Sequence, residues 1–201
     1  VYGRDQVSHR YDLAGRLIPG TDLGSGDSDP SDGDGHGTHV AGIVAAASGN
    51  ARGVSGAAPR VVVMPVKVAS DNGSIWDVTV ALAMDWAVTR GARVINLSLG
   101  GDNASPTVNA AIDRARSRGV VVVAAAGNGG EAVSQPAAYP PALAVAALED
   151  RGAIHGAPGT AARYAHASYS NTGPEVDLAA PGTSIVSTIP VRAGSYALAS
   201  G

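Results

Sequence analysis

Short runs of apolar, mostly β-branched residues recur along the chain and alternate with stretches in which apolar positions return every three or four residues. The four clearest runs lie at 60–68, 93–99, 119–126 and 142–148. Runs that are apolar almost throughout are typical of strands buried on both faces, as in a parallel sheet. Strands that alternate with helices in this way require right-handed crossovers, so the pattern predicts an α/β fold.

The periodic stretches predict three helices, each with one apolar face toward the core. The first begins at His36, and its expected inward positions are Val40, Ile43, Val44 and Ala47. The second covers 75–90 and stops at Gly91, and its expected inward positions are Ile75, Val78, Leu82 and Trp86. The third is capped by Ser105, has Pro106 in its first turn and ends at Gly119, with expected inward positions Val108, Ile112 and Ala115.

Composition narrows the class of protein. Of 201 residues, 45% are hydrophobic and 15% are charged, which suits one globular domain over 1–201 with no internal linker. The net charge of −3 comes without a basic run, so nothing indicates nucleic-acid or membrane-surface binding. The longest apolar run, 120–126, is too short to cross a bilayer, and the lack of cysteine excludes thiol catalysis. Segments 24–35 and 151–171 are expected as surface loops, and three histidines as exposed side chains: His9, His155 and His166.

His36 stands at the head of the first predicted helix, directly after Gly35. An imidazole titrates near neutral pH and a helix start can fix its direction, so His36 is a candidate general base. Two alternatives stay open at this point: an ordinary histidine at a helix start, or a zinc-binding pair with His39. No further histidine or carboxylate follows one or two turns along the helix, which counts against zinc.

Two predicted strands end in residues suited to binding, because ligands of open parallel sheets lie beyond the carboxyl ends of the strands. The first end, 96–101, includes Gly100 and Gly101 and leaves backbone open to pair with another chain. The second end carries Asn128 among residues with little or no side chain. A carboxamide there can donate to a developing oxyanion, and the plain alternative for Asn128 is a turn residue.

Four motifs, in their order and spacing, resemble the subtilases, the subtilisin-like serine proteases. They are His-Gly-Thr-His-Val-Ala-Gly at 36–42, Val-Ile-Asn-Leu-Ser-Leu-Gly-Gly at 94–101, Ala-Ala-Ala-Gly-Asn at 124–128 and Leu-Ala-Ala-Pro-Gly at 178–182. The resemblance covers nearly the whole chain. It implies a three-layer fold, with a mostly parallel sheet flanked by helices on both faces, and an endopeptidase that works by an Asp-His-Ser triad.

The resemblance also implies roles for individual residues. His36 would be the general base and acid, and Asn128 the oxyanion donor. An extended polypeptide substrate would pair with the edge formed by Ser98, Leu99 and Gly100. The substrate residue before the scissile bond would enter a pocket lined by Ala125, Ala126 and Gly127. Because these pocket residues carry no acid, we expect an apolar preference.

The sequence departs from the subtilase pattern at the other two catalytic motifs. It contains neither an Asp-Thr-Gly or Asp-Ser-Gly segment nor a Gly-Thr-Ser-Met-Ala segment. Asp5 and Asp12 follow no predicted buried strand, and Ser195 and Ser200 precede no predicted helix. We therefore expect a partial catalytic domain that lacks the first strand and the serine-bearing helix. Such a chain should be inactive alone and poorly soluble, because apolar faces stay uncovered. A non-catalytic peptide-binding pseudoprotease and a zinc hydrolase remain as alternative classes.

Calcium is the cofactor that the resemblance implies, and no organic cofactor is expected. One site is implied from oxygens of Asp12, Asn50, Arg52 and Val54, and a second from Asp22 and Asp27 in the acidic loop. The plain alternatives are a solvent-facing acid beside a turn, and a solvated acidic loop. We further expect a monomer, and the resemblance implies secretion to the extracellular space.

Overall fold

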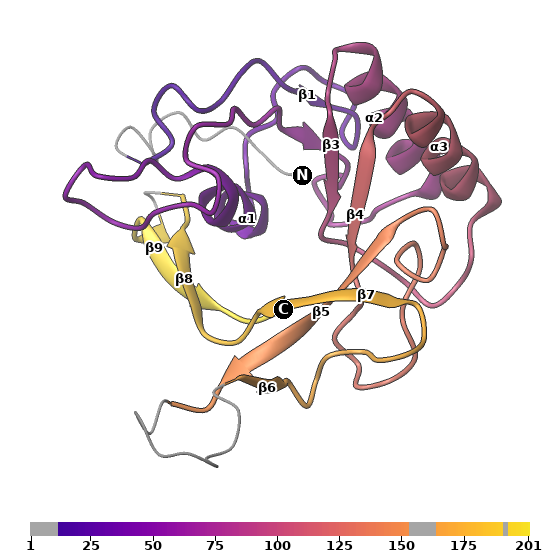
Figure 1. Cartoon of the computed structure of the whole chain (residues 1–201). Coiled ribbons are helices and arrows are strands. Elements are labelled where there is room, and N and C mark those ends of the chain that lie inside the picture. Colours follow the sequence, from indigo (N-terminus) through magenta and orange to yellow (C-terminus); the bar gives the residue numbers. More distant parts are fainter. Residues whose placement is uncertain (1–11, 153–163, 191–192) are drawn as a thin grey trace.

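The predicted α/β class is confirmed in the computed structural model, which describes residues 12–152, 164–190 and 193–201. Its larger sheet contains β3 (Val94–Leu97), β4 (Val121–Ala125), β5 (Leu143–Asp150), β6 (Tyr164–His166) and β7 (Val176–Pro181). All pairings in this sheet are parallel except that of β6 with β5. Strands β3, β4 and β5 lie side by side in this order, and β5 also pairs with β6 and with β7 (Figure 1). Three of the four predicted strands are therefore present, each within about two residues of its expected bounds.

The fourth predicted strand, 60–68, is much shorter than expected. Only β2 (Val66–Lys67) is regular, and it pairs in parallel with β1 (Thr21–Asp22) to form a separate two-stranded sheet. A single bridge between Leu17 and Val63 extends this pairing toward the amino end. A third sheet is the antiparallel hairpin of β8 (Ile185–Thr188) and β9 (Tyr196–Ala199).

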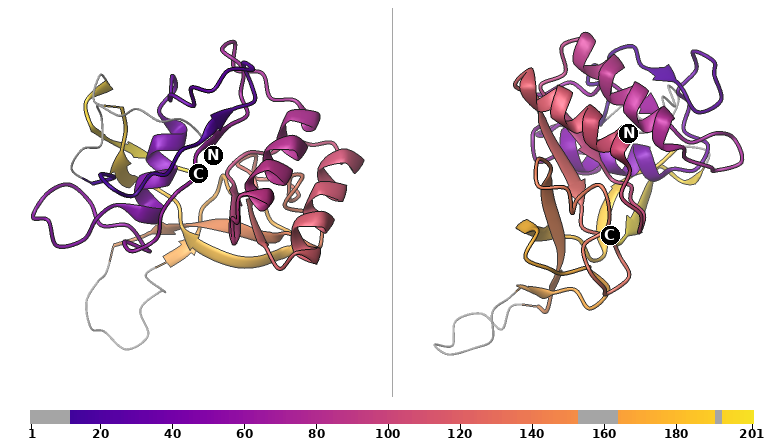
Figure 2. Two further views of the ribbon diagram at one scale, coloured as in Figure 1. Left: turned by 90° about the horizontal axis from the view of Figure 1, so that it is seen from above. Right: turned by 90° about the vertical axis from the view of Figure 1, so that its right-hand side faces the viewer.

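Helices lie on both sides of the larger sheet. Figure 2 shows α2 (Asp77–Thr89) and α3 (Pro106–Ser117) side by side on one side, with α1 (His36–Ala45) on the other. The limits of α3 are as predicted: the Ser105 hydroxyl accepts the Val108 N–H at 3.3 Å, and Gly119 takes a φ of 76° just beyond the end. The predicted inward positions of α3, including Ile112 at 0% exposure, are buried.

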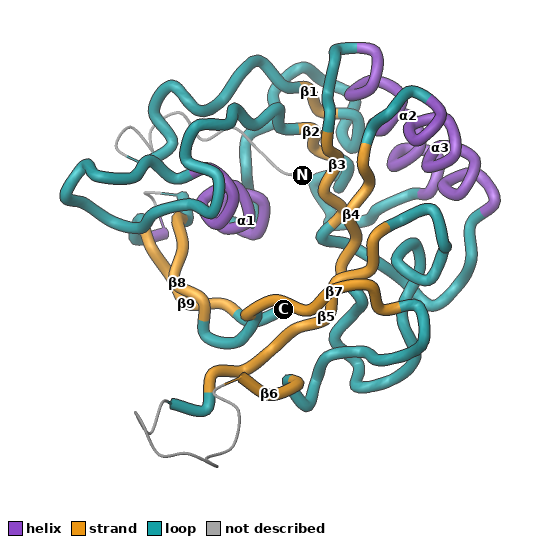
Figure 3. Tube along the Cα trace, viewed as in Figure 1, coloured by secondary structure: helices purple, strands orange, loops and turns teal. Residues whose placement is uncertain are grey.

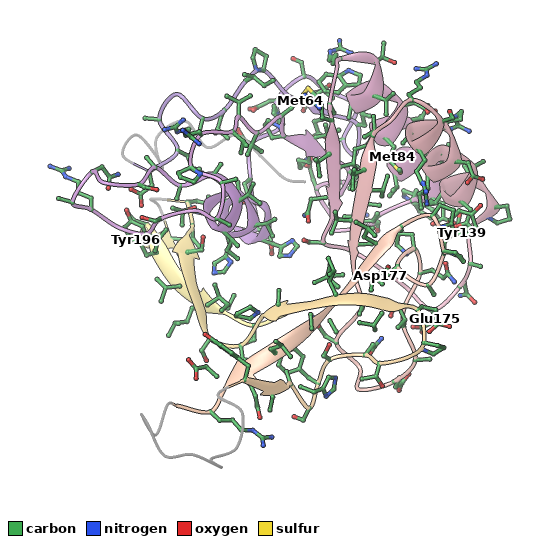
Figure 4. All side chains as sticks on the ribbon, viewed as in Figure 1. Met64, Met84, Tyr139, Glu175, Asp177 and Tyr196 are labelled. Carbon is green, nitrogen blue, oxygen red and sulfur yellow. The ribbon has the colours of Figure 1, made fainter. Side chains whose placement is uncertain are left out.

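The predicted inward face of α2 is wrong. Val78 and Leu82 are 57% and 56% exposed, and the buried positions are Val80, Ala81, Ala83, Met84 and Ala87. The side chain of Met84 points from α2 toward the sheet (Figure 4). This helix is apolar around most of its circumference, so periodicity alone did not single out one face. The buried face is the one that carries Ala83, Met84 and Ala87, which line a cavity beside β3.

The predicted inward face of α1 is correct only in part, because Val40 and Val44 line an internal cavity but Ile43 does not face the core. Ile43 is 40% exposed, whereas Thr38, Ala41, Gly42 and Ala45 are buried. A Cβ atom on Gly42 would overlap the hydroxyl oxygens of Thr188 and Ser187, so α1 lies directly on β8 at this glycine. The hairpin below α1 is visible in Figure 3. Small residues decide which face of the helix is covered, because only they permit this close contact.

A cavity of about 630 Å³ lies between the two parallel sheets. Apolar side chains line it from four elements: Val63, Met64 and Val66 near β2, Val94, Ile95 and Leu97 from β3, Val40 and Val44 from α1, and Val80 and Met84 from α2. Among the described residues, β2 pairs only with β1 and β3 pairs only with β4. The facing edges of β2 and β3 are therefore both unpaired. In the part of the chain that the structure describes, no strand precedes β1 and no α-helix follows α3.

The expected loop over 151–171 is regular in part, because β6 lies within it and pairs with the end of β5. His166 on β6 is exposed, as expected, whereas His9 and His155 lie outside the described residues. No helix in the described ranges is both long enough and apolar enough to span a lipid bilayer.

Candidate active site

His36 is the first residue of α1 and its side chain is exposed. The preceding residue, Gly35, has a φ of 108°, a backbone conformation that favours glycine, and it turns the loop into the helix. Desolvation by the surrounding protein lowers the pKa of His36, and the nearby carboxylates of Asp34 and Asp32 oppose this shift. A pKa below the usual histidine value keeps the imidazole neutral at neutral pH, which is the form that accepts a proton.

Asp32 holds the start of this helix, a role that sequence analysis missed. Its buried carboxylate accepts the N–H groups of Gly35 and Thr38 at 2.7 and 2.8 Å, and the Thr38 hydroxyl at 2.6 Å. A helix start leaves backbone donors without intrahelical partners, and a carboxylate there also meets the positive end of the helix dipole. The sequence signal was an aspartate four residues before His36, in a loop with three other acidic residues.

His39 has a structural environment that differs from that of His36. It is buried, and its Nε2 lies 3.1 Å from the carbonyl of Ile185 and 3.3 Å from that of Ala197. The hydroxyl of Ser187 donates to the backbone carbonyl of His39, which ties the helix to the same hairpin. Through these contacts, His39 holds α1 against the β8–β9 hairpin. No group of three or more potential metal-binding side chains occurs among the described residues, so the zinc alternative gains no support.

Asn128 lies beyond the carboxyl end of β4, in a sharp turn that starts at Gly127 with a φ of 109°. Its side chain is exposed and makes no hydrogen bond within the described ranges. The last residue, Gly201, lies beside it: a Cβ on Gly201 would be 3.3 Å from Asn128 Nδ2. An amide donor is therefore held at a strand exit with its N–H groups available to a ligand.

The predicted substrate edge follows β3. Ser98, Leu99 and Gly100 come after the last paired residue of the strand, and within the described chain their backbone groups form no backbone hydrogen bond. The same three residues line a cavity of about 410 Å³, together with residues from the starts of α2 and α3. Pairing resumes at Gly101, which bridges to Gln135. An unpaired edge beside a cavity has the form needed to bind an extended peptide and one of its side chains.

The three predicted pocket residues at the end of β4 differ in accessibility. Ala126 is 1% exposed, whereas Ala125 and Gly127 are half-buried. The carbonyl of Ala126 accepts the Ser134 N–H at 2.8 Å, and that of Gly127 accepts the Asn171 N–H at 2.9 Å. The carbonyl groups of Ala126 and Gly127 are therefore already hydrogen-bonded within the protein, to Ser134 and Asn171.

A base at a helix start, an amide donor at a strand exit and an open strand edge occur here in the order of one protein family. The sequence model of the Subtilase family matches residues 10–201. The chain belongs to the subtilase family. The predicted resemblance is thereby confirmed.

Named subtilases show the same relationship in sequence. The chain is 40% identical to thermitase of Thermoactinomyces vulgaris over 195 residues, which cover 96% of this chain and 65% of the relative. It is 42% identical to the thermophilic serine proteinase of Bacillus sp. (strain AK1) over 191 residues, covering 94% of this chain and 44% of the relative. The chain thus spans less than two thirds of the length of these curated relatives.

Solved subtilase structures confirm the subtilisin-like fold. The structure titled "Sphericase" has a TM-score of 0.82 and 33% sequence identity, covering 95% of this chain and 67% of that chain. The structure titled "S41 Psychrophilic Protease" also has a TM-score of 0.82, with 34% identity and coverage of 96% and 68%.

The first calcium site expected from the subtilase resemblance contains a buried carboxylate, but its neighbours are hydrogen-bond donors. Asp12 is 1% exposed and accepts Asn50 Nδ2 at 2.9 Å, the Val54 N–H at 3.1 Å and the Tyr196 hydroxyl at 2.8 Å. Asn50 Oδ1 instead accepts the N–H of Arg52. Calcium requires several converging oxygens, so the arrangement of donors around the Asp12 carboxylate does not fit the ion.

The second expected calcium site is not assembled either. Asp22 is buried and forms an ion pair with Lys67, whose ammonium group also contacts Ser25 and Asp71. Desolvation acts in the other direction, but hydrogen bonds to Asp22 and Asp71 raise the pKa of Lys67, which keeps the ammonium charged. Asp27 is exposed and accepts the N–H of Asp29. Lysine thus neutralises the carboxylate that calcium was expected to bind.

Proposed function

We propose that the protein is a serine-type endopeptidase in which this chain supplies the general base, His36, and the oxyanion donor, Asn128. The observation that carries the proposal is the subtilase match over 10–201 together with the placement of both residues. Asp32 accepts hydrogen bonds from the helix start that carries His36, and Asn128 lies between two hydrogen-bonded residues, Gly127 and Gly129, with an available amide. An amide aimed at a developing oxyanion contributes about 3 kcal/mol to transition-state binding, a magnitude measured in this protein family.

The other two triad members are proposed to come from outside these 201 residues. The carboxylate of Asp12 already accepts three hydrogen bonds, and the Ser200 hydroxyl accepts the Ser184 N–H at 2.9 Å. The cavity between β2 and β3 supports one further strand in the complete protein. An extended apolar segment running parallel to both edges would join the two sheets and supply the aspartate at its end. The proximity of Gly201 to Asn128 supports a nucleophile soon after residue 201.

The proposed substrate is a polypeptide that lies along Ser98, Leu99 and Gly100 as an added strand. Main-chain hydrogen bonds to this edge would give affinity, and pockets would select side chains. The small residues Ala125 and Gly127 at the end of β4 support an apolar side chain before the scissile bond. We also propose that the protein acts as a monomer outside the cell.

Calcium at the Asp12 loop remains a proposal that requires a local rearrangement. The Asn50 carboxamide would have to present its oxygen, and Tyr196 would have to leave the Asp12 carboxylate. A buried aspartate supports the proposal, because its charge is costly without a counter-charge. The test is thermal unfolding of the protein with calcium and with chelator: a melting temperature that is independent of calcium rules the site out.

The experiment for the main proposal uses the full-length protein and the 201-residue chain separately. Each is incubated with a chromogenic peptide substrate, as wild type and as His36→Ala and Asn128→Ala. We expect hydrolysis only by the full-length protein, with a loss of at least about 10³-fold in His36→Ala and about 10²-fold in Asn128→Ala. Proteolysis by the isolated chain that depends on His36 would refute its predicted inactivity.

Peptide binding without hydrolysis by the full-length protein would instead favour the alternative, a non-catalytic pseudoprotease. Labelling by a serine-directed sulfonyl fluoride separates the two. The protease reacts at one serine, and a pseudoprotease does not react.

A further inference from the structure

The loop that carries Asn128 contacts the buried side-chain amide of Asn171, in addition to backbone hydrogen bonds with Tyr169 and Thr172. This side chain is 4% exposed. Its Oδ1 accepts the N–H groups of Gly129 at 2.8 Å and Glu131 at 3.1 Å, and its Nδ2 donates to the Ser134 hydroxyl at 3.0 Å. Asn171 therefore uses both ends of its carboxamide on one loop, which comes about 40 residues earlier in the chain.

Asn128 lies between two residues that Asn171 holds. On one side, the backbone N–H of Asn171 donates to the Gly127 carbonyl at 2.9 Å, and on the other its side chain accepts the Gly129 N–H. The backbone on each side of Asn128 is thus fixed to the same residue. Its side chain stays exposed and forms no hydrogen bond in the described part of the chain.

The contact between the loop and Asn171 is also tight. A Cβ atom on Gly127 would overlap Asn171 Nδ2, so the turn lies directly on the carboxamide. Gly127 has a φ of 109°, a conformation that other residues rarely adopt. The close contact and the hydrogen bonds to Asn171 restrict the backbone path of 127–131, and that path sets the direction in which the Asn128 amide points.

We infer that Asn171 is a positioning residue for oxyanion binding, acting through the backbone of 127–131 on Asn128. The inference rests on the proposed function, in which Asn128 donates to the oxyanion. A donor aimed in advance stabilises developing charge without reorganising during the reaction. Without the Asn171 side chain, the N–H groups of Gly129 and Glu131 lose their acceptor. Only backbone contacts then hold the loop, such as the Gly130 N–H to the Tyr169 carbonyl at 2.7 Å, so the path on either side of Asn128 is less restricted. Asn128 is then present but poorly aimed, and small misplacements of catalytic groups are costly.

The test measures kcat and KM of the full-length protein for a chromogenic peptide, with Asn171→Ala, Asn128→Ala and the double variant. We expect Asn171→Ala to lower kcat about tenfold or more and to change KM less than about threefold. In the Asn128→Ala background the same substitution should lower kcat no further, because its effect passes through Asn128. Equal losses of kcat in the two backgrounds would indicate a purely structural role and overturn the inference.

Two further variants keep the test decisive. Ile112→Val, on the buried face of α3, removes a buried methyl group and should lower stability while leaving kcat unchanged. Ser134→Ala removes only the acceptor of Asn171 Nδ2 and should lower kcat about twofold to fivefold. If Asn171→Ala does not fold, an unchanged kcat in Ser134→Ala overturns the inference. An unchanged kcat in Asn128→Ala would refute the proposed function itself, whereas a loss there with none in Asn171→Ala refutes this inference alone.

Discussion

The phenol of Tyr196 donates a 2.8 Å hydrogen bond to Oδ2 of Asp12, joining residues that are 184 positions apart in the sequence. The contact ties the first described residues to the β8–β9 hairpin. The Asp12 carboxylate therefore accepts hydrogen bonds from three groups, because Asn50 and Val54 donate the other two. The side chain of Tyr196 lies at the hairpin, on the α1 side of the molecule (Figure 4).

This contact predicts an unusual tyrosine titration. Desolvation, and then the hydrogen bond to Asp12, raise the pKa of Tyr196 to about 12 from a reference of 10.0. A raised folded-state pKa contributes stability below about pH 10 that is lost as the pH rises toward 12. Tyrosinate absorbance should show a late-ionising group that is missing in Tyr196→Phe. The variant should also lose less stability than the wild type over that pH interval. A difference spectrum with its midpoint near pH 10 would contradict the assignment.

Asp32→Ala should destabilise the helix that bears His36. The carboxylate serves two backbone N–H groups at the start of α1, and losing a helix-capping group typically costs about 1 to 2 kcal/mol. Chemical denaturation measures the change in the free energy of unfolding. Asp29→Ala is the matched control, because Asp29 is an exposed acid of the same loop that bonds only locally, and it should change stability by less than about 0.5 kcal/mol. Equal effects of the two substitutions would refute the anchoring role of Asp32.

Gly42→Ala should also be destabilising, although alanine is the better helix former. The helix propensity gained is about 1 kcal/mol. The added methyl group, however, would overlap the hydroxyls of Thr188 and Ser187, both of which are hydrogen-bonded to α1, and overpacking typically costs about 1 to 3 kcal/mol. Thermal unfolding of Gly42→Ala should therefore show a lowered melting temperature. Gly33→Ala is the control, because no atom lies within 4 Å of its added Cβ. A stabilised Gly42→Ala variant would show that the hairpin moves away freely.

In the 201-residue chain, the His36 imidazole should lose its proton with a pKa below 6.5. Desolvation lowers this pKa and Asp34 raises it, so Asp34→Asn should move the titration to still lower pH. Because the unfolded chain binds this proton more readily than the folded chain, His36 contributes a loss of stability as the pH falls below 6.5. The measurement is an NMR titration of the His36 imidazole from pH 4 to 8. An upward shift in Asp34→Asn would contradict the assignment.

The elements were more predictable from the sequence than their orientation. Strands β3, β4 and β5 and all three helices were found, because apolar runs and caps such as Ser105 are local signals. The buried face of α2 and part of that of α1 were not. There the choice depended on which small residues, such as Gly42 or Ala83, meet a neighbour, and that is a property of the packed molecule.

The sequence predicted where the two proposed site residues lie, but not the residues that support them. His36 was expected at a helix start and Asn128 at a strand exit, and the structure has them there because local motifs carry both. Asp32 and Asn171 were missed because each acts through backbone N–H groups, some of them about 40 residues away, that no local pattern reveals. The two calcium assignments relied on the family resemblance. The resemblance did not show that Tyr196 and Lys67 lie against Asp12 and Asp22.

The seating of α1 on the β8–β9 hairpin also sets an order of events during synthesis. The hydrogen bonds that hold the helix, from Ser187 to the His39 carbonyl and from Thr188 to the Thr38 carbonyl, join residues 148 and 150 positions apart. A ribosome makes the helix well before the hairpin, and contacts of such long sequence separation form slowly. The nascent chain therefore carries His36 on a helix without this support until the β8–β9 segment has also been translated.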